Sequence, residues 1–382
     1  TRFRWVSWAR DVYKRQHQKI SIDEAESPTS ASGSGEWLIW IEDSGQEISI
    51  TATNVISKTN RTLGGMTWES QPQVVSSGNS FVVYDEFRVD YFRHDSEAGI
   101  LEPIFSEYSA ESLIDISISS SSINTGYIAM LSNESLRIVD TSDQSTRILE
   151  SVPNSSVVAS SGPLVAFSAN TPSGPTVNIT SADSDLTLTI LLDPRSSEGI
   201  EESIRNSGTL LDFGNSTIVE LVMDSNWLVA TVDVGPFNRT IMVDTSSINQ
   251  TLISNPRWDS SSPSIGEGKV AFLQVTRDSI ISTSQDSLRN NDVYVYYIES
   301  AETRQHTFDD DVDQFQPQIL LDRLAWIEVN DQGEKQLLVY SFIDTIEPRN
   351  SLLLQASILA MIPLIFLWTL QSYGAKIVTQ RV

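Results

Sequence analysis

The chain has 382 residues, of which 40% are hydrophobic, so it can bury a large core and is not a disordered protein. Its 50 acidic residues outnumber its 25 basic ones, and the resulting net charge of -25 excludes binding to the phosphates of nucleic acid. Because there is no cysteine, a disulfide framework and a thiolate metal site are also excluded. The acidic residues are scattered, and we expect them to form a solvated surface adapted to salt.

The first segment, residues 1–16, is predicted to lie outside the fold. The chain begins without Met, and the run Asp11 to Gln16 resembles the in-frame translation of a transposase end used to prepare sequencing libraries. We therefore interpret these residues as a sequencing or cloning artefact. The alternative is a genuine basic amphipathic start.

Seven short apolar phrases then recur along the chain at an average spacing of about 48 residues. They are Trp37–Trp40, Phe81–Tyr84, Tyr127–Met130, Leu164–Phe167, Trp227–Ala230, Lys269–Phe272 and Arg323–Trp326. A repeat of this size is typical of propeller blades, in which each unit buries its faces against its neighbours. The spacing predicts an all-β, seven-bladed β-propeller over residues 17–345.

Further strands are predicted after these phrases, where short apolar or alternating runs are bounded by turn residues. Examples are Glu47–Thr51, Ser135–Val139, Leu186–Ile190 and Asp292–Tyr296. The long interval between Phe167 and Ala230 predicts a loop insertion at 193–201 on one face.

Two runs near the end of the repeat region have a family resemblance. Asp292 to Glu299 followed by Glu302 to Thr307 resembles the TolB-like propeller repeat, and so does Phe315 to Ile319 followed by Asp322 to Trp326. In that family a proline precedes the next inner strand, and Pro72, Pro263 and Pro317 match that position. The repeat also resembles the propellers of prolyl oligopeptidases, whose hydrolase domain has no counterpart in this chain.

Ring closure requires an additional strand, because the seventh blade has only three predicted strands, near Gln316, Leu324 and 337–342. Lys19 to Glu24 resembles the outer-strand ending Gln305 to Asp310. We expect residues 17–24 to pair beside 337–342 and remove the exposed edge.

The C-terminal region is predicted to cross a membrane. After a linker at 346–351, residues 352–370 are almost wholly apolar and long enough for a transmembrane helix. Trp368 and Tyr373 lie where an interfacial aromatic belt is expected, and 371–382 would form a short cytoplasmic tail. The propeller would then be extracellular or periplasmic. The alternative is a buried core helix.

Catalytic chemistry is not indicated by the sequence. The three histidines are His17, His94 and His306, and no Gly-x-Ser-x-Gly elbow accompanies them. We interpret His94 as an exposed loop residue and expect no catalytic residues, no enzyme activity and no cofactor. No zinc, P-loop or dinucleotide motif is present.

Two kinds of candidate site remain. Asp309, Asp311 and Asp313 could offer carboxylates to Ca²⁺, with an acidic turn between blades as the alternative. Seven Asn-x-Ser/Thr sequons are candidates for glycosylation, the alternative being unmodified turn residues. They are Asn60, Asn133, Asn154, Asn178, Asn215, Asn238 and Asn249.

Taken together, these features favour a non-enzymatic cell-surface or envelope propeller that presents loops to a protein or glycan partner and is tethered by a membrane helix. Two alternatives stay open. One is a propeller-type hydrolase or lyase acting at the central funnel, and the other is a structural subunit of a membrane-envelope complex.

Overall fold

A computed structural model describes residues 28–342, apart from 44–46, 67, 69, 96–99, 123–124, 134, 151, 153, 197–198, 276–290, 308–311 and 331. Lys19–Val339 form one compact unit, and Thr1–Gln18 with Tyr340–Val382 form a second. Within the second unit only 340–342 are described, where the rings of Tyr340 and Phe342 meet edge to face at 6.0 Å.

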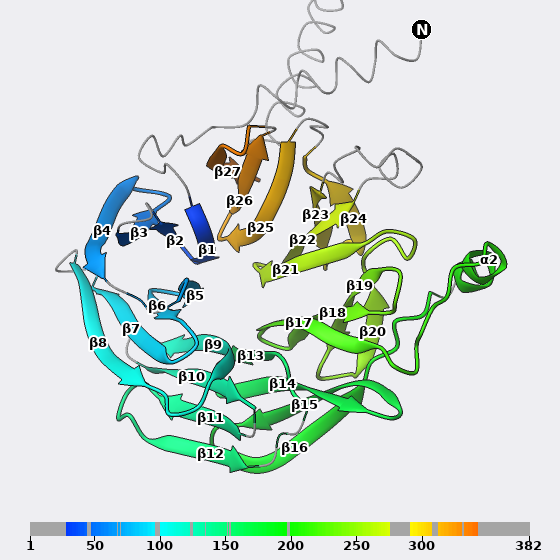
Figure 1. The fold of residues 1–382 in the computed structure, drawn as a ribbon, viewed down its shortest axis with the longest axis horizontal. Coiled ribbons are helices and arrows are strands. Elements are labelled where there is room, and N and C mark those ends of the chain that lie inside the picture. The colour runs from blue at the N-terminus through cyan, green and yellow to red at the C-terminus, as the bar shows by residue number, and fades with distance from the viewer. Residues whose placement is uncertain are drawn as a thin grey trace, which may run out of the picture. The chain divides into compact units, whose positions relative to one another are not determined.

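Among the described residues, seven antiparallel sheets follow one another along the chain, six with four strands and the last with three, which confirms the seven-bladed propeller. Figure 1 shows them placed in order around a common axis, with the first sheet beside the last. The innermost strands are β1 (Pro28–Ser34), β5 (Gln73–Ser77), β9 (Leu113–Ser122), β13 (Val158–Ser161), β17 (Thr217–Asp224), β21 (Ser260–Gly266) and β25 (Val312–Leu320).

The other strands of each blade lie progressively further from the axis. The second strands are β2 (Trp37–Asp43), β6 (Ser80–Tyr84), β10 (Thr125–Ser132), β14 (Leu164–Thr171), β18 (Trp227–Asp233), β22 (Lys269–Val275) and β26 (Arg323–Asn330). The third are β3 (Ile48–Asn54), β7 (Arg88–Asp95), β11 (Ser135–Asp140), β15 (Gly174–Ser181), β19 (Asn238–Asp244), β23 (Asn291–Tyr297) and β27 (Lys335–Ser341). The outer ones are β4 (Thr59–Met66), β8 (Ile100–Tyr108), β12 (Thr146–Glu150), β16 (Ser184–Leu191), β20 (Asn249–Leu252) and β24 (Glu302–Gln305).

The seven recurring phrases are the second strands. Each lies in the middle of its blade and is covered on both faces by neighbouring blades, so both faces are apolar. Every residue of β6 is buried, for example, and Leu228 and Val229 in β18 have no exposed surface. Buried clusters therefore join one blade to the next, as where Leu38 and Trp40 of blade 1 pack with Ile327 of blade 7.

The innermost strands present a different problem, because the edge that faces the axis has no fifth strand to pair with. Unpaired buried N–H groups are costly, so each needs another acceptor. At all seven junctions a side-chain oxygen of one innermost strand accepts a bond from a backbone N–H that lies within, or directly after, the innermost strand of a neighbouring blade. The acceptor–donor pairs are Ser32–Ser76 (2.9 Å), Ser77–Ser120 (3.0 Å), Asp115–Val158 (2.8 Å), Ser161–Ser225 (2.7 Å), Glu220–Ser262 (2.7 Å), Ser264–Ile319 (3.0 Å) and Gln316–Ala31 (2.8 Å).

Closure between blades 7 and 1 depends on two glutamines. Gln316 Oε1 accepts the N–H of Ala31, and Gln318 Oε1 accepts the N–H of Gly33 at 3.1 Å. A Cβ on Gly33 would lie 2.6 Å from the Leu320 side chain, so glycine lets β1 approach β25 closely.

Two of the prolines matched to the family pattern lie inside innermost strands, and not ahead of them. The register shifts around Pro263 in β21 and around Pro317 in β25. Proline donates no N–H, so it is tolerated at such bulges. The residues before them, Ser262 (φ 53°) and Gln316 (φ 47°), adopt the left-handed region.

The predicted insertion is present between blades 4 and 5, where the chain forms the short helix α2 (Ile200–Asn206). Arg239, which has no exposed surface, anchors this segment by donating to the carbonyl of Pro194 at 2.6 Å and to Glu201 at 3.0 Å. Its other terminal nitrogen donates to the carbonyl of Pro256 at 2.9 Å, so one guanidinium connects the insertion to the body of blade 5.

The predictions for the chain ends are not tested. The artefact at 1–16, the closing strand at 17–24, the linker at 346–351, the span at 352–370 and the tail at 371–382 all lie outside the described residues. Within the described part, no helix is long and apolar enough to cross a membrane.

We expect the double substitution Gln316→Ala and Gln318→Ala to lower the free energy of unfolding by about 1–3 kcal/mol for each N–H left without an acceptor. Urea unfolding measures this effect. Gln332→Ala, in an exposed turn of the same blade, is the matched control and should change stability by less than about 0.5 kcal/mol. A double variant as stable as this control would contradict the role given to the two glutamines.

Candidate functional site: the central channel

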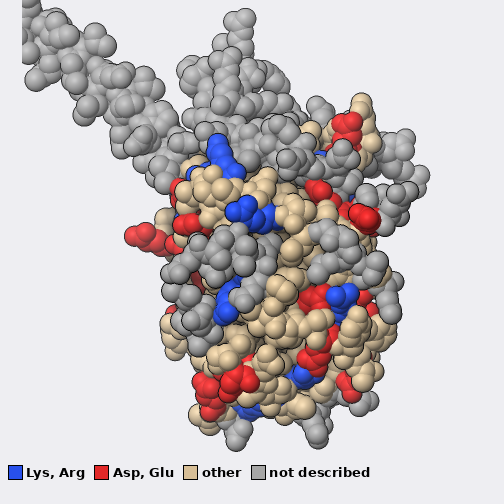
Figure 2. Space-filling model, turned by 90° about the vertical axis from the view of Figure 1, so that its left-hand side faces the viewer, with Lys and Arg blue, Asp and Glu red and all other residues tan. Residues whose placement is uncertain are grey.

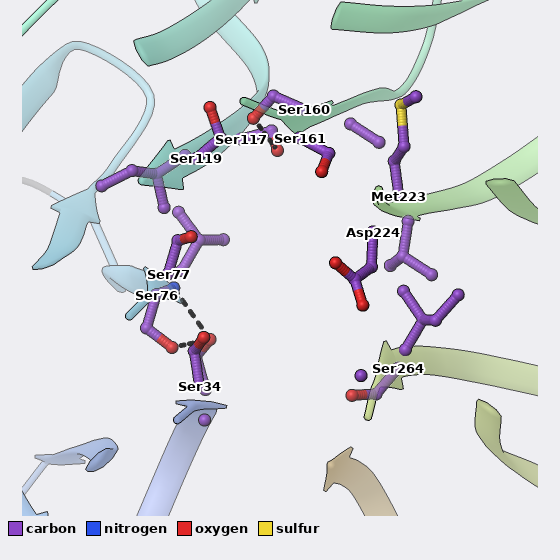
Figure 3. A pocket seen from close by; sticks show the side chains of 18 of the residues that line it. Ser34, Ser76, Ser77, Ser117, Ser119, Ser160, Ser161, Met223, Asp224 and Ser264 are labelled. Carbon is purple, nitrogen blue, oxygen red and sulfur yellow. Dashed lines mark hydrogen bonds between the residues drawn. The ribbon is translucent and has the colours of Figure 1, made fainter. Parts of the chain in front are cut away.

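A cavity of about 430 Å³ lies on the axis of the ring and is lined by the innermost strands of all seven blades. Serine is the most frequent lining residue, at ten of the 32 positions. Figure 3 shows serines from blades 1 to 4, among them Ser34, Ser76, Ser117 and Ser160, around one part of the wall, with Met223 and Asp224 of blade 5 on the other. The channel therefore combines a hydroxyl wall with a mixed wall of apolar and acidic groups.

Serine suits this position for two reasons. Its side chain is short enough for seven strands to converge on one axis, and its hydroxyl can accept a bond while donating another. Ser117 and Ser160 hydroxyls are 2.9 Å apart across a junction, and the Ser119 hydroxyl donates to the carbonyl of Gly162 at 2.7 Å. The same hydroxyls thus hold the blades together and face the channel.

Tight turns end the innermost strands at one mouth of the channel. Gly35, Gly78 and Gly162 follow a serine and have φ values of 59°, 59° and 54°. This left-handed conformation matches the short turns that connect twisted antiparallel strands. Each turn leads at once into a second strand.

Two of the seven junctions use a carboxylate as the acceptor. Asp115 accepts the N–H groups of Val158 at 2.8 Å and Ile116 at 2.9 Å. Burial nevertheless raises the pKa of its carboxyl from 3.8 to about 6. Burial also raises the pKa of Glu220, which accepts the N–H of Ser262, and burial together with the Asp115 charge raises the pKa of Tyr84.

A second cavity, of about 220 Å³, lies between blades 2 and 3. Its one arginine, Arg137, is paired with both carboxylate oxygens of Glu107, and its Ser132 hydroxyl donates to Glu111 at 2.7 Å. Because these charged and polar groups are already satisfied by one another, the axial channel is the better candidate site.

The predicted calcium site is only partly described. Asp309 and Asp311 lie outside the described residues, whereas Asp313, in β25, accepts the N–H of Asn291 at 2.7 Å. Burial raises the pKa of Asp313. No group of three His, Asp or Glu side chains suited to a metal is found among the described residues.

The histidine interpretation needs one correction. His94 is not an exposed loop residue, because it lies in β7, is 9% exposed and packs on Trp37 with ring centroids 3.9 Å apart. His306 lies in blade 6, where its Nε2 is 3.1 Å from the hydroxyl of Tyr297. These two histidines therefore belong to different blades, and His17 lies outside the described residues.

The sequons differ in exposure. Asn60, Asn133, Asn154, Asn215 and Asn249 are exposed, and Asn178 and Asn238 are half-buried. In the last two, the threonine of the sequon is buried as well (Thr180 1% and Thr240 0% exposed). Glycosylation stays a prediction, and the exposed five are the better candidates.

The channel residues were not predicted from the sequence, although a signal for them exists. Three of the recurring apolar phrases follow within a few residues of a Ser-Gly pair, at Ser34-Gly35, Ser77-Gly78 and Ser161-Gly162. When these serines are interpreted only as turn residues, the innermost strands that end at them are not predicted.

No family model matches the chain, and no curated protein is significantly similar to it. Solved structures are similar in fold. The acylaminoacyl peptidase of Pyrococcus horikoshii matches with a TM-score of 0.56 and 8% identity, over 84% of this chain and 52% of its own. The β-propeller domain of the Trilobed protease from Pyrococcus furiosus, which has an open velcro topology, matches with a TM-score of 0.54 and 10% identity over 82% and 95% of the two chains.

A third neighbour is the propeller domain of Cps50 (Swd1) from Myceliophteria thermophila, with a TM-score of 0.52 and 13% identity over 82% of this chain and 96% of its own. At such identities the likeness establishes the propeller fold. The chain spans about half the length of the acylaminoacyl peptidase that it matches.

These comparisons correct the interpretation of the chain as a non-enzymatic surface protein. Peptidases and puromycin hydrolases recur among the structural neighbours.

We expect Asp115→Asn to remove a pH dependence of stability. The folded pKa of Asp115, about 6, lies above its ordinary value of 3.8, so the folded state keeps a proton that the unfolded state has lost. Asp115 therefore does not destabilise the fold below pH 4, where it is protonated in both states. Between pH 4 and pH 6 its contribution to the free energy of unfolding falls, because only the unfolded state ionises freely. The advantage of the variant over the wild type should grow by about 2–3 kcal/mol between pH 4 and pH 7.

Chemical unfolding of the two proteins across this pH range measures the difference, in which the titrations of all other carboxylates cancel. A difference that stayed constant, or that became smaller with rising pH, would contradict the burial of an ionisable Asp115.

Proposed function

We propose that this chain is the propeller of a hydrolase that acts on peptides, and that its central channel is the route by which the substrate reaches the reacting groups. The observation that carries the proposal is the open axial channel of about 430 Å³ with its wall of hydroxyls. The peptidases among the structural neighbours support it.

The channel suits an extended peptide chemically. A peptide carries one N–H donor and one C=O acceptor per residue, and both must be satisfied when it leaves water. Serine hydroxyls can donate or accept in turn, so they accommodate a backbone without reading its sequence. The apolar side chains on the wall near Asp224, such as Val222, Met223 and Ile265, offer contacts to the aliphatic parts of side chains.

The described residues supply the channel, and the reacting groups would be supplied by a catalytic unit outside them. The TolB-like relationship and the C-terminal membrane tether are compatible with this role and remain predictions.

The test uses the absence of cysteine from the chain. Ser76→Cys introduces one thiol into the channel, and a bulky maleimide attached after folding then obstructs it. We expect peptide hydrolysis by the chain together with its catalytic unit, isolated from the cells that make them, to fall by about tenfold or more on labelling.

Ser142→Cys, in an exposed turn of blade 3, is the matched control and should keep its activity when labelled in the same way. Unchanged hydrolysis in the labelled channel variant would overturn the route. An unlabelled preparation that hydrolyses no peptide at all, with its thermal transition intact, would overturn the function.

A further inference from the structure

The charges that line the channel have one sign. Its lining includes three carboxylates, from Asp115, Asp224 and Glu267, and none of the described lining residues is Lys or Arg. The outer surface differs. On the face shown in Figure 2, basic and acidic side chains are interspersed with uncharged surface. A charged ligand therefore meets charges of both signs on that face and carboxylates alone along the channel.

Asp224 is the carboxylate best placed to act on a ligand. It is the last residue of β17, and Ser225 beside it has a φ of 55°. The N–H of Ser225 donates to Ser161 at 2.7 Å, which fixes this turn to blade 4. In Figure 3 the carboxylate points into the channel and faces the part of the wall that carries Ser34, Ser76 and Ser77. The Ser225 hydroxyl donates to Asp224 Oδ1 at 3.2 Å.

The other two carboxylates have different roles. Asp115 uses both oxygens to accept backbone N–H groups, so it contributes charge but little free bonding capacity. Glu267 lies in the exposed turn between β21 and β22, at the mouth of the channel. Low-dielectric walls concentrate the field of such groups along the axis.

We propose that the channel admits cationic peptide segments in preference to anionic ones, and that Asp224 sets this preference. The inference rests on the proposed function only where it identifies the peptide as a substrate. The charge selectivity of the channel can be measured without any hydrolysis. Lysine and arginine side chains and free amino termini would be favoured there, whereas acidic segments and phosphates would be disfavoured.

The experiment measures how fast charged thiol reagents react with the Ser76→Cys variant. Trimethylammonioethyl methanethiosulfonate is cationic, and sulfonatoethyl methanethiosulfonate is anionic. In both cases the thiolate attacks the sulfenyl sulfur, a mixed disulfide forms and methanesulfinate leaves. Any effect of the channel on the thiol's own ionisation is common to the two reagents, so the ratio of their rates reports the field.

Relative to the ratio on a free thiol, the cationic reagent should react about tenfold faster, as expected for one carboxylate several ångströms from the reagent in water. Adding Asp224→Asn should reduce this preference at least threefold. Adding Glu202→Gln instead, which removes an equal charge from the exposed helix α2, should leave it unchanged and so controls for the net charge of the whole protein.

Protection of the thiol by added peptides identifies the class of ligand directly. Tetralysine should slow the modification of the Ser76→Cys thiol, and tetraglutamate should not. A rate ratio equal to that on a free thiol, a preference that survives Asp224→Asn, or equal protection by the two peptides would overturn the inference. These outcomes do not depend on hydrolysis, so they are distinct from a failure of the proposed function.

Discussion

The structure depends on how the innermost strands satisfy the backbone groups that no further strand can pair with. A propeller places seven such edges around one axis, and each is partly buried by its neighbour. In this chain a side-chain oxygen is the acceptor at every described junction, but the residue that supplies it differs. It is serine at four junctions, a carboxylate at two, and glutamine between blades 7 and 1. Each acceptor belongs to one blade and each donor to the next, so the bonds link the blades into a closed ring.

The character of the channel follows from this constraint. At four junctions the acceptor is a serine hydroxyl, which is short enough for the strands to converge, so these parts of the wall are polar without being charged. At the junctions formed by Asp115 and Glu220, burial raises the pKa of both carboxyl groups, because desolvation disfavours their ionised form. Asp224 differs from them, because none of the junction bonds between described residues uses its carboxylate, and it faces the channel.

The apolar part of the fold could be predicted from the sequence and the polar part could not. The phrases Phe81–Tyr84 and Trp227–Ala230 are apolar on both faces because neighbouring blades cover them, and that signal is local. Asp292–Tyr296 was likewise correctly predicted, within β23. The strand Ser260–Gly266 has almost no apolar periodicity, since its conformation is stabilised by partners distant in sequence, such as Glu220. The candidate site lies on strands of this second kind.

Amide hydrogen exchange tests the ring of junction bonds most directly. The N–H groups of Ala31, Ser76, Val158 and Ser262 face a neighbouring blade and not a paired strand, and an exposed edge would exchange rapidly. Our expectation is that these amides are protected nearly as strongly as those of the central second strands, and that Gln316→Ala with Gln318→Ala removes protection at Ala31 first. Exchange at these positions as fast as in the exposed turns would contradict it.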